Sequence, residues 1–180
     1  MGNRRGQAMI EAIVALSALV IAFVGVYGLL STSLRYNRFV ANDYTATYLA
    51  AEGIEVVKNL LDSNIIAGRS WDCGFMNGTY ELTYDTQFTD TGGGTADCLQ
   101  SVLTPVSTNP RNLYLDPTSH LYNYNVPVSG TFVRTVTATI LKSDALGNPQ
   151  EIQVNSRVSW GQGTGSRNIN LEDRFFNWHP

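Results

Sequence analysis

The chain has 180 residues, of which 43% are hydrophobic and 15% are charged, and its formal net charge at neutral pH is −3. This composition excludes a disordered polyelectrolyte, and the 12 Lys and Arg residues form no basic run that would bind nucleic acid. We therefore expect one globular domain with an appendage and no nucleic-acid partner.

The first predicted element is an apolar segment from Ala8 to Leu30, in which the only acidic or basic residue is Glu11. As a helix, its 23 residues measure about 35 Å, which exceeds the roughly 30 Å hydrocarbon core of a bilayer. A Sec-type signal peptide is the competing interpretation, but its apolar region has only about 7 to 15 residues and precedes a small-residue cleavage site. The segment therefore predicts a transmembrane helix.

Glu11 lies inside this segment, where a carboxylate costs about 2.5 to 3.5 kcal/mol on insertion scales and usually faces a partner. One interpretation is that Glu11 lies near the interface and extends its carboxylate to water. A second follows from Arg4 and Arg5, which precede Gly6. A cut after Gly6 creates an α-amine at Gln7, one helical turn from Glu11. The two charges then attract strongly in a low-dielectric medium, where each relieves the cost of burying the other.

The basic leader that ends in Gly6, followed by Gln7-Ala8-Met9-Ile10-Glu11 and a long apolar helix, resembles the class III signal of type IV prepilins and type II secretion pseudopilins. The resemblance implies a membrane prepilin peptidase that cuts after Gly6 and methylates the new amine of Gln7. It also implies that Glu11 assists docking into a growing filament, that the leader is cytoplasmic, and that everything after the helix is exported. The chain departs from the family at Gln7, where phenylalanine is usual.

Cys73 and Cys98 are the only cysteines in the chain. They are 25 positions apart, and neither belongs to a C-x-x-C pair or has nearby histidines at zinc spacing. The export implied by the resemblance favours a disulfide between them, which would stabilise the domain by about 3 kcal/mol in the chain-entropy model. Buried free thiols are the alternative.

An amphipathic helix is predicted to continue from the apolar segment to Asp62. Apolar or small residues recur every three or four positions at Val40, Tyr44, Thr47, Ala51, Ile54, Val57 and Leu61. Helix-ending signals follow in residues 62–64 and at Gly68. We therefore predict a leader in residues 1–6 and one helix over residues 7–62, with residues 8–30 in the membrane and residues 31–62 amphipathic. A coiled-coil stalk is the alternative, but leucine heptads are missing.

The remaining residues, 63–180, predict a β-rich head. Apolar and polar residues alternate over residues 80–84, and again over 132–140, 152–160 and 168–172. Short turns join the last three runs, which favours an antiparallel meander. One apolar face of this sheet needs a cover, and the amphipathic helix supplies one. The predicted fold class is α+β, with a long N-terminal helix packed on an antiparallel sheet as in pilins. The closing sequence of the chain is also similar to the C-terminal end of minor pilins.

The segment from Thr86 to Gly130 has weak periodicity and predicts a loop region. Its glycine-rich run, residues 91–95, lacks the lysine and the following helix of a phosphate-binding loop, so we interpret it as an ordinary flexible loop. His120 and His179 are isolated, and no nucleophile is paired with a base. We therefore expect no enzymatic activity and no cofactor.

Three carboxylates in or next to this loop are candidate calcium ligands. Their spacing fits no EF-hand, and calcium needs six to eight oxygen ligands. We therefore interpret the three as solvated loop residues and expect no metal: Asp85, Asp90 and Asp97.

Three roles remain, of which the first is a structural subunit, of the minor kind, in a type IV pilus or a related filament. The second is a pseudopilin of a type II secretion system, and the third is a membrane-anchored extracellular binding domain in which Glu11 is incidental. The resemblance implies as partners other pilin subunits through their N-terminal helices, the prepilin peptidase, the assembly machinery and membrane lipid. It also implies a single-pass cytoplasmic membrane protein that moves to a cell-surface filament.

Overall fold

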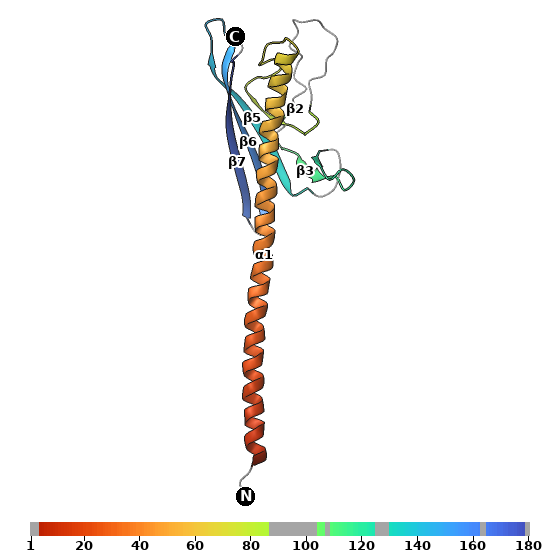
Figure 1. Cartoon of the computed structure of the whole chain (residues 1–180), viewed down its shortest axis with the longest axis vertical. Coiled ribbons are helices and arrows are strands. Elements are labelled where there is room, and N and C mark those ends of the chain that lie inside the picture. The colour runs from red at the N-terminus through yellow and green to blue at the C-terminus, as the bar shows by residue number, and fades with distance from the viewer. Residues whose placement is uncertain (1–3, 87–103, 107–108, 125–129, 163–164, 179–180) are drawn as a thin grey trace. The chain divides into compact units, whose positions relative to one another are not determined.

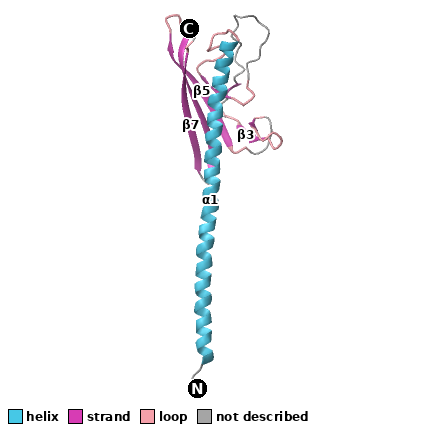
Figure 2. Cartoon of the chain, viewed as in Figure 1, coloured by secondary structure: helices cyan, strands magenta, loops and turns pink. Residues whose placement is uncertain are grey.

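The structure is a computed structural model that describes residues 4–86, 104–106, 109–124, 130–162 and 165–178. In these ranges the chain forms one helix and seven strands (Figures 1 and 2). The elements are α1 (Arg4–Ile66), β1 (Gly78–Glu81), β2 (Thr104–Pro105), β3 (Asn112–Leu115), β4 (Tyr122–Asn123), β5 (Phe132–Ser143), β6 (Pro149–Gln162) and β7 (Gly165–Phe176). All strand pairs are antiparallel, so the predicted α+β fold class is confirmed.

The sheet is built around the meander β5–β6–β7. β5 pairs with β6 from Phe132 opposite Trp160 to Ser143 opposite Pro149. β6 pairs with β7 without a register shift. β1 and β3 pair with the other edge of β5, and the two-residue strands β2 and β4 extend them. The turn between β5 and β6 has Gly147 at φ 91°, a left-handed conformation that glycine adopts without steric cost. The predicted meander and this turn are confirmed.

The chain divides into two compact units, Met1–Asn42 and Asp43–Pro180, and α1 contributes to both. In the second unit, residues 43–66 of α1 cover one face of the sheet. Every third or fourth residue of this segment is buried, so the predicted helical period is confirmed but the predicted face is wrong. Tyr44, Thr47 and Ala51 of the predicted apolar stripe are exposed, because the helix turns a neighbouring row of apolar side chains toward the sheet. The buried apolar side chains are Ala46, Leu49, Ala50, Val56, Val57, Leu60 and Leu61.

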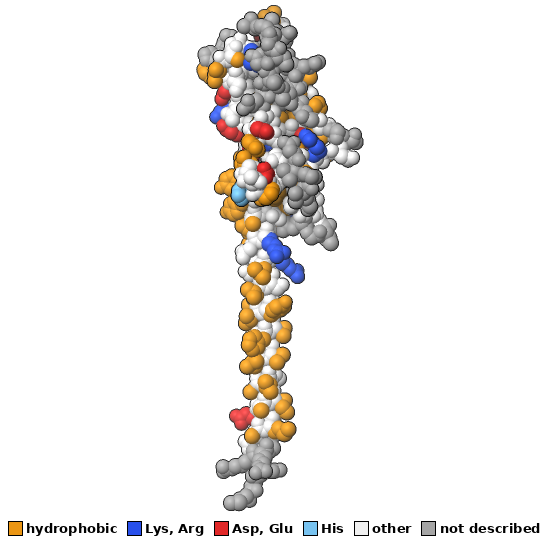
Figure 3. Space-filling model, turned by 90° about the vertical axis from the view of Figure 1, so that its right-hand side faces the viewer, with side chains coloured by type: hydrophobic (Ala, Val, Ile, Leu, Met, Phe, Trp, Pro, Cys, Tyr) orange, Lys and Arg blue, Asp and Glu red, His pale blue; other side chains and the backbone are white. Residues whose placement is uncertain are grey.

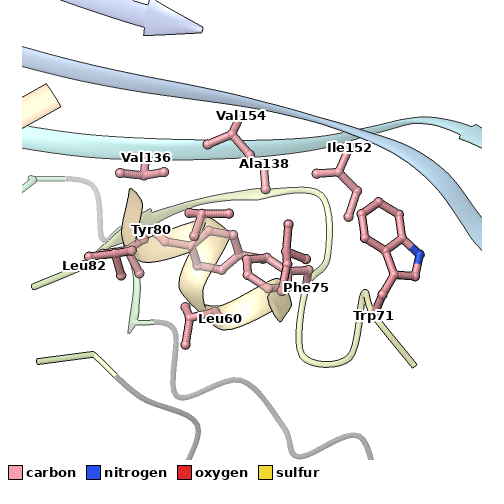
Figure 4. Close-up of a cluster of buried hydrophobic side chains, with 12 residues drawn as sticks. Leu60, Trp71, Phe75, Tyr80, Leu82, Val136, Ala138, Ile152 and Val154 are labelled. Carbon is pink, nitrogen blue, oxygen red and sulfur yellow. The ribbon is translucent and has the colours of Figure 1, made fainter. Parts of the chain in front are cut away.

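Two clusters of buried side chains join α1 to the sheet. One gathers Val57 and Leu60 with Val136 of β5 and Ile152 and Val154 of β6, and Figure 4 shows these strands facing the helix. The other packs Ala46, Leu49 and Ala50 against Leu113, Phe132, Val158 and Trp160. Because apolar side chains alternate along β5 and β6, all of them reach the same face of the sheet.

Gly53 allows the helix to approach the sheet closely. A Cβ atom at this position would lie 3.0 Å from Cγ2 of Val136 and would also contact the side chain of Ser156. Glycine therefore removes a steric obstacle between the two clusters, although it weakens an isolated helix by about 1 kcal/mol relative to alanine.

The helix ends at Ile66, four residues after the predicted end at Asp62. Gly68 adopts φ 67°, and the amide of Arg69 donates to the carbonyl of Asn64 at 2.9 Å. This arrangement is a glycine-terminated helix end. The Asn64 side chain belongs to the predicted helix-ending signal, but it is buried inside the helix end and donates to the carbonyls of Trp71 and Cys73. Tertiary hydrogen bonds therefore extend the helix beyond its local signals.

Candidate functional site

Every residue of the apolar segment of α1, residues 8–30, is exposed, and Figure 3 shows the hydrophobic side chains on one face of it. Between Met9 and Leu30 the large hydrophobic side chains are each 52% to 75% exposed. Proteins that remain monomeric in water rarely expose apolar patches above a few hundred Å². By length and composition this helix can cross a membrane, and its exposed apolar surface is better accommodated by lipid or other apolar helices than by water. The prediction of a membrane-spanning helix is confirmed to this extent.

Two hydroxyl groups in and next to the span are satisfied within the helix itself. The hydroxyl of Ser17 donates to the carbonyl of Val14 at 2.8 Å, and just beyond the span that of Thr32 donates to the carbonyl of Gly28 at 2.9 Å. Such back-bonded hydroxyls need no other partner in lipid. The segment is therefore compatible with a hydrocarbon environment except at Glu11.

Glu11 is exposed. Within the residues whose side chains the structure describes, no hydrogen bond or ion pair reaches its carboxylate. Gln7 lies four positions earlier on the same helix, which places its backbone about 6 Å along the axis and on the same face. Gly6 is helical as well. The structure thus brings Gly6, Gln7 and Glu11 onto consecutive turns of one helix.

The other predicted site residues divide between described and undescribed parts of the chain. Cys73 is buried, with 4% of its surface exposed, whereas Cys98 lies outside the described residues, so their disulfide stays a prediction. Asp85 and His120 are exposed. Asp90, Asp97, His179 and the glycine-rich run lie outside the described residues. Among the side chains that the structure does describe, no three His, Cys, Asp or Glu residues gather closely enough to hold a metal ion.

Arg134 is a residue of the head that the sequence reasoning overlooked. It lies on β5, and its side chain is fully buried under α1. Its Nη1 donates to the carbonyl of Leu49 at 2.9 Å and pairs with Oε1 of Glu52 at 3.0 Å, and its Nη2 donates to the carbonyl of Leu82 at 2.5 Å. The guanidinium of Arg134 therefore links β5 both to α1 and to Leu82, the residue that follows β1. The sequence does carry a signal for Arg134. It stands at a position of β5 where the alternation otherwise places apolar residues that face the core.

Glu151 forms a second buried charged site, on β6. Its carboxylate pairs with Nζ of Lys142 at 3.0 Å and with Nη1 of Arg174 at 3.1 Å, although only 5% of its side chain is exposed. The hydrogen bond from Lys142, supported by Arg174, holds the pKa of Glu151 below the usual value of a glutamate. These pairs connect the three strands of the meander.

The low pKa of Glu151 predicts how the stability of the head depends on pH. A carboxylate whose pKa is lowered on folding contributes stability above its unfolded pKa, about 4.3, and loses that contribution as the pH falls toward the folded value. We expect the free energy of unfolding to fall in acid, and Glu151→Gln to reduce this dependence. Lys142→Met removes the donor but keeps the carboxylate, and is expected to act in the same direction. Denaturant titrations between pH 7 and pH 3 measure the effect, and unchanged profiles in both variants contradict it.

Comparisons with family models, with curated proteins and with solved structures give no match to this chain.

Proposed function

We propose that this chain is a structural subunit, of the minor kind, in a type IV pilus or a related filament. The observation that carries the proposal is the combination found on α1: an apolar surface exposed on all sides and one carboxylate, Glu11, without a partner among the described side chains. The preceding Arg-Arg-Gly-Gln sequence, residues 4–7, supplies a processing signal at the correct distance. The proposal therefore rests on residues at the N-terminal end of the helix.

The mechanism begins with cleavage after Gly6. Hydrolysis of the bond between Gly6 and Gln7 leaves a cationic amine on the first residue of the mature chain. That amine lies one helical turn from the Glu11 carboxylate of its own chain, or within reach of Glu11 on an adjacent subunit. When the helix moves from lipid into a filament, neighbouring apolar helices replace the acyl chains at little cost, because both surroundings are apolar. The amine and the carboxylate then neutralise each other.

A plain membrane anchor explains these residues less well. An anchor needs only residues 8–30, and it gains nothing from a carboxylate that costs about 2.5 to 3.5 kcal/mol in the bilayer. It also needs no helix that continues into the head, whereas α1 runs for 63 residues without a break. A subunit transferred from bilayer to filament uses both features. In this proposal the head is exported from the cytoplasmic membrane and reaches the cell surface in the filament.

Processing at Gly6 is the first test. We expect chain that is co-expressed with a prepilin peptidase to begin at Gln7, as intact-mass and N-terminal peptide spectra will show. Gly6→Val is expected to retain all six leader residues, because a branched side chain obstructs the scissile bond. Gly25→Ala is the matched control, since a Cβ at Gly25 meets nothing within 4 Å, and it should be processed normally.

Two results would contradict the proposal. One is a native chain that keeps residues 1–6 in the presence of the peptidase. The other is a mature chain in which Gln7 has cyclised to pyroglutamate, because that product has lost its cationic amine. Methylation of Gln7 keeps the positive charge and is the expected modification.

A further inference from the structure

β7 forms one edge of the sheet (Figure 1). It has 12 residues, and among the described residues it pairs only with β6. An edge strand of this length carries a row of backbone N–H and C=O groups that can pair with another strand. β7 is therefore the longest potential docking edge in the described part of the sheet.

Two of the usual devices that block edge pairing, proline and a β-bulge, are missing from β7. Residues 165–176 contain no proline, and the register with β6 shows no bulge. Charges of a single sign would repel a second copy, but the charged residues of β7 have both signs. Two are basic and two are acidic: Arg167, Arg174, Glu172 and Asp173. The charges on this edge thus do not exclude pairing with a second copy.

The two faces of β7 restrict how a partner strand can align. Ile169, Leu171 and Phe175 are half-buried and pack against the clusters under α1, so odd-numbered residues face the helix side. A second β7 that continues the same face must therefore place odd residues opposite odd residues. Only a few antiparallel registers meet this condition.

We propose that the β7 edges of two copies of this chain pair antiparallel about a two-fold axis at Asn170. This register places Arg167 opposite Asp173 and Ile169 opposite Leu171, and the symmetry forms each pair twice. On the other face Asn168 lies opposite Glu172, and Ser166 lies opposite Arg174. Opposite charges and apolar neighbours are favourable cross-strand pairs, and no like charges are opposed.

Neighbouring registers with the same face parity are poorer. An axis at Leu171 places Ile169 opposite Asp173, and an axis at Ile169 places Arg167 opposite Leu171. Both replace ion pairs with contacts between charged and apolar groups. In the structure Arg167 lies 4.0 Å from Asp43, with about half of its side chain exposed. A partner carboxylate can therefore approach it without displacing buried groups.

A two-fold axis that reverses β7 also reverses residues 43–66 of α1, which pack on the same sheet. The occupant of the β7 edge in this proposal is a second copy of this chain.

Disulfide trapping tests the register. Full-length chain is inserted into nanodiscs at one copy per disc, so that any dimer must link two discs. Asn170→Cys is expected to form a covalent dimer under mild oxidation, because directly opposed residues have Cα atoms about 4.5 to 5.5 Å apart, within disulfide reach. Asn168→Cys and Glu172→Cys are each expected to fail alone, since each lies about 13 Å from its own copy. Mixed together, those two variants are expected to crosslink.

The chain without these substitutions is the control for any crosslinking through its own cysteines, Cys73 and Cys98. A charge exchange supplies a second readout: Asp173→Arg is expected to weaken disc pairing at least fivefold, and Arg167→Asp combined with Asp173→Arg to restore it. Absence of an Asn170→Cys dimer, or equal crosslinking by all three single variants, would overturn the register. Both assays are independent of cleavage at Gly6 and of Glu11, so their failure leaves the proposed function intact.

Discussion

Replacing Glu11 by leucine is expected to leave membrane insertion intact and to reduce incorporation into filaments about 100-fold. In the native chain the Gln7 amine and the Glu11 carboxylate enter the apolar filament interior as a neutral pair. In the variant the amine enters alone, at a cost comparable to the roughly 2.5 to 3.5 kcal/mol for a charge at the centre of a membrane helix. Since about 1.4 kcal/mol is a factor of ten, this corresponds to roughly two orders of magnitude.

Two matched variants separate charge from hydrophobicity. Ser17→Leu also replaces a polar residue of the apolar segment by leucine, but its hydroxyl is already bonded to the carbonyl of Val14, so near-native incorporation is expected. Glu11→Gln keeps the shape and removes the charge, and should resemble Glu11→Leu. The measurement is the ratio of filament-bound to membrane-bound protein in sheared cells. Native incorporation of Glu11→Leu would remove the basis of the proposed function.

Much of the fold was predictable because hydrophobic residues recur in this sequence with two clear spacings, one helical and one typical of strands. The three-to-four spacing from Val40 to Leu61 predicted the helix but not its buried face, and period-two alternation predicted the meander of β5, β6 and β7. Both patterns arise from burial, but the helix pattern has the wrong phase, because Leu49, Val56 and Leu60 are buried and lie outside its spacing. They extend over many residues, so single exceptions do not obscure them.

The missed elements are those that local patterns do not encode. β2, β3 and β4 have two to four residues each, too few for a periodic signal, and they fall inside the segment that we read as a loop. β1 covers Gly78–Glu81 rather than residues 80–84. Its pairing with β5 from Gly78 to Tyr80 fixes the strand, and a hydrogen bond from the amide of Thr86 to the carbonyl of Thr83 turns the chain soon after.

The candidate site was predictable because its residues are contiguous in sequence, whereas the groups that hold the head together are not. Arg134 contacts Leu49 and Leu82, which are 85 and 52 positions away. No local spacing rule relates such residues. The self-complementary edge of β7 likewise needed the observed pairing with β6, since the parity of its faces decides which registers are allowed.

Replacing Arg134 by methionine is expected to lower the free energy of unfolding of the head by about 2 to 4 kcal/mol. The guanidinium is fully buried, and its removal leaves the carbonyl of Leu82 without this donor and Glu52 without its counter-ion. An unsatisfied buried carbonyl costs about 1 to 3 kcal/mol, and breaking a buried ion pair costs about 3 to 5 kcal/mol. Because the Glu52 side chain is 32% exposed, water recovers part of the second cost.

The controls distinguish the fixed geometry of the guanidinium from its charge. Arg134→Lys keeps the charge but cannot reach Leu49, Glu52 and Leu82 together, because an ammonium lacks the planar fork of donors. It should therefore recover only part of the loss. Arg157→Met makes the same substitution on the neighbouring strand β6, where the side chain is exposed, and should change stability by less than about 0.5 kcal/mol. Urea denaturation followed by tryptophan fluorescence measures all three, since Trp71 and Trp160 are buried. If Arg134→Met and Arg157→Met unfold at the same urea concentration, the buried arginine does not fasten α1 to the sheet.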